Sequence, residues 1–225
     1  MKKLLLATFL VTLISCGTGQ RASEKTFTTE MVSQLAGHWS RNTTSLDVGQ
    51  WTKYSIMRPD GKGEKFVKKA VVGKEDDGSY WVESTATDGE NSTIFKFKVD
   101  AEGNVRGLYL GKPGEVGKKV EQKESSPASE AVKPKLDMKE EFEVVDVPAG
   151  KFYCTKVTTI LTYKDGATTS QASWLNRGVP FWNNIGGRTY GGFVRMEREG
   201  VTVELIGYGS DAEAELEVRN DDNAK

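Results

Sequence analysis

The sequence predicts a mainly β protein, with about ten strands in one antiparallel sheet and one or two short helices. From about residue 51, runs rich in β-branched and aromatic residues alternate with glycine-, asparagine- and aspartate-containing turn signals. The links between most runs are only a few residues long. Parallel neighbours would need crossovers of about a dozen residues or more, so the short links favour antiparallel pairing.

The strand-like runs form two groups. The first group comprises Trp51–Arg58, Lys65–Gly73, Ser79–Thr87, Ser92–Asp100 and Asn104–Leu110. The second comprises Glu141–Val147, Lys151–Tyr163, Thr169–Asn176, Gly191–Glu199 and Val201–Tyr208. In the run 92–100, Phe95 and Phe97 share one face and Lys96 and Lys98 share the other, which predicts one dry and one wet face.

Three other stretches lack this alternation. Residues 111–140 are charged, rich in proline and serine and poor in apolar residues, which indicates a long insertion, with a short helix near 128–132. A helix is also expected from Thr28 to the glycine at 37. The acidic, polar tail 211–225 is expected to fray or to form a short surface helix.

The N-terminus has the features of an export signal. Two lysines follow Met1, and the apolar run Leu4–Ile14 is shorter than the roughly 20 residues that span a bilayer. Residues 1–15 are therefore interpreted as a signal peptide. The stretch from Leu13 to Cys16 resembles the lipobox of bacterial lipoproteins, which implies cleavage before Cys16 and a diacylglycerol group on its sulfur. The alternative is an ordinary secretory signal that contains a cysteine.

This interpretation divides the chain into a lipidated tether at 16–27 and a single β-rich domain at 28–210. Removal of Lys2 and Lys3 leaves 29 of the 31 basic residues against 32 acidic ones in the mature chain. Because this chain is not basic overall, nucleic acid is not an expected partner. The acyl chains would anchor the protein in a membrane. By resemblance, Gly17 after Cys16 favours the bacterial outer membrane, with the domain facing the periplasm; exposure at the cell surface stays open.

Few residues offer catalytic or metal-binding chemistry. His38 is the only histidine and Cys154 the only cysteine besides Cys16, which excludes a zinc site of several histidines or cysteines. Cys154 lies in a β-like run and is expected to be a small buried hydrophobe. The sequence has no P-loop either. We therefore expect no enzyme activity, no cofactor and no metal.

Aromatic residues near the C-terminus are the best candidate site. Trp174, Phe181 and Trp182 lie close together in a glycine-rich connection between two strands. The favoured interpretation is that this connection folds over the sheet as a lid and fills the core. The other is that these rings, with Phe95 and Phe97, line an apolar cavity.

The lipobox, the ten strands and the aromatic connection from Trp174 to Phe193 together resemble the LolA/LolB-type group of bacterial envelope proteins. That resemblance implies a strongly curved, unclosed sheet or barrel that can hold a lipid or acyl chain. The insertion at 111–140 departs from this pattern, so a non-enzymatic structural or protein-interaction lipoprotein with a packed core is the alternative. A lipocalin-like barrel is a third interpretation, from Gly37-His38-Trp39 and Gly49-Gln50-Trp51, which resemble the motif that opens lipocalins.

Overall fold

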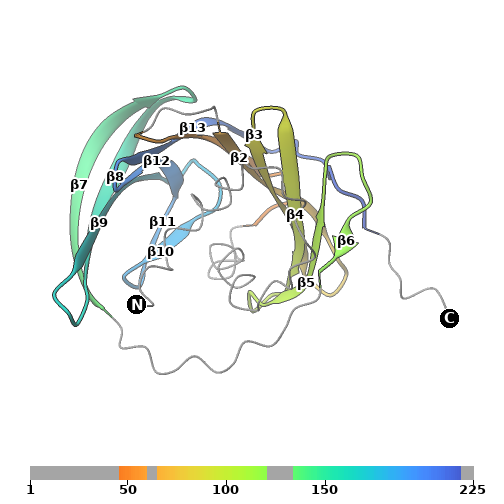
Figure 1. Cartoon of the computed structure of the whole chain (residues 1–225), viewed down its shortest axis with the longest axis horizontal. Helices are drawn as coiled ribbons and strands as arrows, with labels where there is room; N and C mark the ends of the chain where they lie inside the picture. Colours follow the sequence, from red (N-terminus) through yellow and green to blue (C-terminus); the bar gives the residue numbers. More distant parts are fainter. Residues whose placement is uncertain (1–45, 60–64, 121–133, 219–225) are drawn as a thin grey trace.

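A computed structural model describes residues 46–59, 65–120 and 134–218. Eleven strands form one sheet in the order β6-β5-β4-β3-β2-β1-β13-β12-β9-β8-β7, and every pair is antiparallel. The sheet curves strongly but does not close: β6 and β7 end it on opposite sides (Figure 1). The prediction of a mainly β, antiparallel, curved and unclosed sheet is confirmed.

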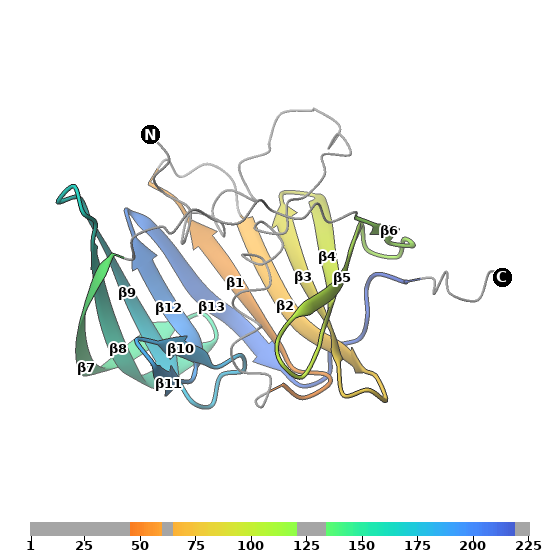
Figure 2. The ribbon, with the colours of Figure 1, turned by 90° about the horizontal axis from the view of Figure 1, so that it is seen from below.

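The first half of the chain forms a meander that runs from the centre of the sheet to one edge. Its strands are β1 (Trp51–Met57), β2 (Lys65–Lys74), β3 (Tyr80–Asp88), β4 (Asn91–Val99), β5 (Val105–Gly111) and the short β6 (Lys118–Lys119). Figure 2 shows these strands side by side. Glycines with positive φ at 78, 89 and 103 make the tight turns between them, as their turn signals predict.

The second half starts at the opposite edge and returns to the centre. Its sheet strands are β7 (Lys135–Val147), β8 (Gly150–Thr162), β9 (Thr168–Asn176), β12 (Gly192–Arg198) and β13 (Val201–Gly209). β13 pairs with β1 and so joins the two halves in one sheet. A separate two-stranded ribbon, β10 (Asn183–Ile185) and β11 (Arg188–Tyr190), lies inside the curve (Figure 1).

The two faces of the sheet carry different coverings. We call the face on the side of β10 and β11 the inner face: Tyr190 of β11 packs there against Val157 and Leu175. The connection before β10 also covers this face, because Phe181 packs against a cluster that includes Phe97 and Leu108. The chain beyond β13 crosses the outer face, over the first half of the sheet (Figures 1 and 2).

Three short strands escaped the sequence analysis, and one strand is longer than expected. β6, β10 and β11 have only two or three residues each, too few to show an alternation. β7 begins at Lys135, inside the stretch expected to be an insertion, because its first residues pair with the far end of β8. The expected helices at 28–37 and 128–132 lie outside the described residues, and the described residues form no helix.

Two expectations about exposure were wrong. Residues 211–218 form no helix: they cross the outer face as irregular chain, and Leu216 is fully buried; the remainder of the predicted tail, 219–225, lies outside the described residues. Lys96, assigned to a wet face, is buried beneath this segment. The covering chain replaces water on part of the outer face, so the alternation of polar residues no longer marks exposure there.

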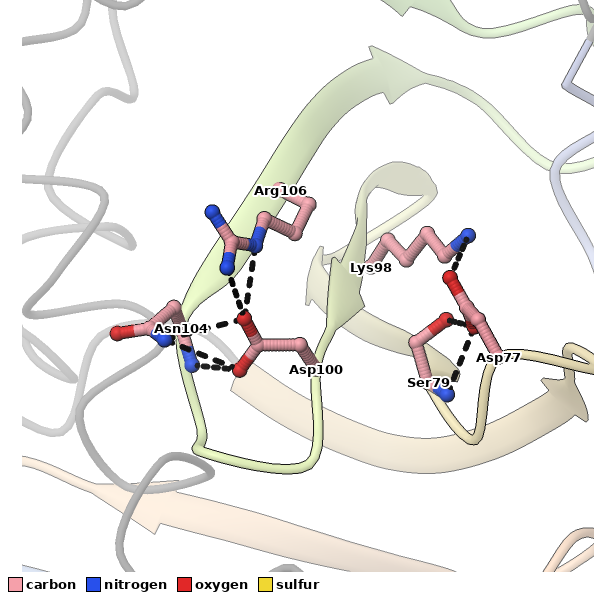
Figure 3. Close-up of polar contacts among 6 residues, drawn as sticks. All are labelled: Asp77, Ser79, Lys98, Asp100, Asn104 and Arg106. Carbon is pink, nitrogen blue, oxygen red and sulfur yellow. Dashed lines mark hydrogen bonds and ion pairs between the residues drawn. The ribbon is translucent and has the colours of Figure 1, made fainter.

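Polar side chains brace two neighbouring turns, at the β2–β3 and β4–β5 ends (Figure 3). Asp77 accepts hydrogen bonds from the backbone N–H and the hydroxyl of Ser79, and Lys98 lies 3.2 Å from its other oxygen. Asp100 accepts hydrogen bonds from Asn104 and Arg106 in the next turn. Such side-chain bonds to nearby backbone groups fix tight turns.

These bonds give a testable titration. The hydrogen bonds from Ser79, and then the hydrogen bond from Lys98, lower the pKa of Asp77 to about 2. Ser79→Ala removes the hydroxyl donor but keeps the backbone donor, so the pKa of Asp77 should rise while staying below its ordinary value. Carbon-detected NMR titration of the carboxyl measures it. An unchanged pKa in the variant would contradict the contribution of the hydroxyl.

Candidate functional site

Three of the five predicted ligand-lining rings come together on the inner face. Phe95 and Phe97 lie in one cluster with Val82 and Leu108, and Phe181 packs against that cluster from the connection before β10. Phe97 is only 1% exposed. In the described residues, these rings therefore pack against the protein's own side chains.

The backbone at Phe181 is held in an unusual conformation. Its φ of 63° lies in the left-handed region, which non-glycine residues adopt at a cost. The side-chain amide of Asn183 donates to the carbonyls of Phe181 and Gly191, both at 3.0 Å, and so ties the two ends of the connection together. A side chain at Gly192 would collide with the carbonyl of Pro180. The connection is thus fitted closely over the inner face.

The other two predicted rings do not belong to this cluster. Trp174 alternates with the inward-packed Leu175 and pairs across the strands with Lys156 and Arg195, so it belongs to the outer face. Lys156 and Arg195 lie over its ring, and its indole N–H donates to Glu143 at 3.0 Å. Trp182 is 37% exposed, the most of the five. The structure does not bring these two rings together with Phe95, Phe97 and Phe181.

A short polar row interrupts the apolar inner face. Thr52 pairs directly with Lys69, and Lys69 pairs with Ser84, so the three side chains lie in line across β1, β2 and β3. Burial lowers the pKa of Lys69 to about 8, and Thr52 is fully buried. Sequence reasoning missed this row because each member lies on a different strand.

The outer face holds a segment of the chain in a specific site. We call residues 211–217 the strap. The carboxylate of Glu83 accepts hydrogen bonds from the backbone N–H groups of Glu215 and Leu216, at 3.0 and 3.1 Å. The ammonium of Lys96 lies 3.1 Å from the same carboxylate and donates to the carbonyl of Leu216 at 2.6 Å. A buried ion pair is therefore satisfied by the backbone of the strap.

Further contacts fasten both ends of the strap. The indole N–H of Trp51 donates to Asp211 at 2.7 Å, and Lys68 pairs with Glu215 at 2.6 Å. The side chain of Leu216 fits against Gly111 and Gly117, where any side chain would collide with it. A surface groove of about 540 Å³ remains between the strap and β1–β2, lined by Trp51, Lys53, Lys68 and residues 211–215.

An exposed apolar patch lies on the β7–β8 hairpin. Phe142 is 92% exposed and Tyr153 is 81% exposed; Val144, directly opposite Tyr153, is exposed as well. Alternation along β7 puts Phe142 and Val144 on one face. We call Phe142, Val144 and Tyr153 the hairpin patch.

The opposite face of the same hairpin is buried. Val145, Val147, Phe152 and Cys154 belong to a core cluster. The hairpin is thus apolar on both faces, and only one of them is covered. In sequence, four of the six residues in Phe142–Val147 are apolar and fall on both faces of the strand, a signal that the sequence analysis did not use.

Cys154 is buried, as expected, and burial, with a smaller effect from the charge of Glu143, raises the pKa of its thiol to about 11, so the reactive thiolate is scarce at neutral pH. The described segments contain no group of three or more histidine, cysteine, aspartate or glutamate residues placed to bind a metal. Within them no helix has the length and apolar character needed to cross a bilayer.

Comparisons with known proteins found similar solved structures but no matching family or curated protein. The similar solved structures include a protein of Bacteroides fragilis described as exported, with a YmcC-like fold; a protein of Parabacteroides distasonis described as a lipoprotein; and a DUF1329 family protein of Desulfovibrio piger.

These similarities are distant. The first two structures are 16% and 15% identical to this chain, with TM-scores of 0.35 and 0.36, and each match covers 72% of this chain and 96% of the other. The third is 13% identical, with a TM-score of 0.28, and covers 80% and 92%. We assign neither a family nor a function from similarities at this level.

Proposed function

We propose that the protein is a lipid-anchored bacterial envelope lipoprotein whose β-domain docks another envelope protein, without catalysis of its own. The anchor would be acyl chains on Cys16, inferred from the lipobox-like sequence. The outer membrane is the proposed location, with the domain on the periplasmic side. The hairpin patch is the observation that carries the docking proposal.

Two features of the structure favour protein docking over carriage of an apolar ligand. Phe95, Phe97 and Phe181 are packed against neighbouring side chains of the protein, which supports the interpretation of the connection as a lid over the core. Phe142 and Tyr153, in contrast, expose almost their whole side chains. Exposed aromatic groups of this kind are typical of protein interaction sites, where they bury large areas at a small entropic cost.

A photocrosslinking amino acid at position 142 tests the docking proposal in cells of the source bacterium. We expect an adduct with one envelope protein, and no such adduct when the crosslinker replaces Lys118 at the other edge of the sheet. The purified partner should then bind Phe142→Ser at least tenfold more weakly than the wild type. Adducts with phospholipid alone, or equal adducts at both positions, would contradict protein docking.

A second candidate function is the binding of an amphipathic lipid on the inner face. The polar row of Thr52, Lys69 and Ser84 beside the ring cluster favours it, because a cationic and hydroxyl-bearing row suits a polar lipid head beside apolar side chains. Native mass spectrometry of the domain purified from a bacterium tests this function. Recurrent lipid adducts that Lys69→Gln reduces would support it, and lipid-free protein in every preparation would contradict it.

A further inference from the structure

We draw no further inference here: the strongest candidate, the hairpin patch beside the edge strand β7, belongs to the docking site already proposed, and nothing in the structure shows which chain covers it.

Discussion

Lys96→Met should cost about 3–5 kcal/mol in free energy of unfolding, the range observed when one partner of a buried ion pair is removed. Glu83 and Lys96 are both buried under the strap. In this variant the carboxylate of Glu83 still accepts hydrogen bonds from the N–H groups of Glu215 and Leu216, but it has lost the positive charge that balanced it. The carbonyl of Leu216 also loses the hydrogen bond that Lys96 donates to it. Urea unfolding of the mature chain with Cys16→Ser measures the change.

A nearby lysine supplies the matched control. Lys98 lies two residues further along β4 on the same face and pairs with the exposed Asp77, so Lys98→Met should cost less than about 1 kcal/mol. Glu83→Gln/Lys96→Met should be less destabilised than the sum of the single variants by about 0.5–3 kcal/mol, because the two groups interact. Equal costs for Lys96→Met and Lys98→Met would contradict the role of the buried pair in holding the strap.

Cys16→Ser should move the protein from the membrane fraction to the soluble fraction almost completely. Each buried methylene of an acyl chain contributes about 0.8 kcal/mol to membrane affinity, and two or more chains give stable anchoring. A serine hydroxyl does not take the place of the thiol in thioether formation, so the variant should incorporate no labelled palmitate. Fractionation and palmitate labelling measure the two effects.

Cys154 is the matched control for this experiment. Its thiol is buried in the β-domain, so Cys154→Ser should leave labelling and fractionation unchanged, with some loss of stability. Palmitate incorporation that persists in Cys16→Ser but disappears in Cys154→Ser would place the acyl group on the wrong cysteine for this account.

The strand pattern was predictable because each long strand carries its own signal. In β4, apolar and polar residues alternate from Phe95 to Val99, and the flanking turns contain Gly89 and Gly103 with positive φ. Pairing along such strands follows from the short turns between them. The curvature and the missing closure came from the resemblance to an envelope-protein group, since alternation alone fixes neither.

The strap could not be predicted from its own residues. The stretch 211–217 is acidic and contains one leucine, which is typical of an exposed tail or surface helix. Its site depends on Glu83 and Lys96, more than 110 residues away in sequence, and on two glycines that leave room for Leu216. A binding site made by distant residues leaves no local pattern in the bound segment.

The arrangement of the predicted rings also depends on which face of the sheet each strand residue occupies. Phe95, Phe97 and Phe181 do meet, but period two put Trp174 on the opposite face from its neighbour Leu175, and the sequence analysis did not assign that face. The hairpin patch was overlooked because Phe142 and Tyr153 looked like ordinary strand residues. Only the position of β7 at an edge shows that one face of the hairpin stays uncovered.

The anchoring on which the proposed function rests can be tested directly by mass spectrometry of the N-terminal peptide of the protein purified from its own membranes. The account predicts a peptide that begins at Cys16, lacks residues 1–15 and carries a diacylglyceryl group on the sulfur. A mature chain that begins at another residue, or a Cys16 with a free thiol, would contradict it.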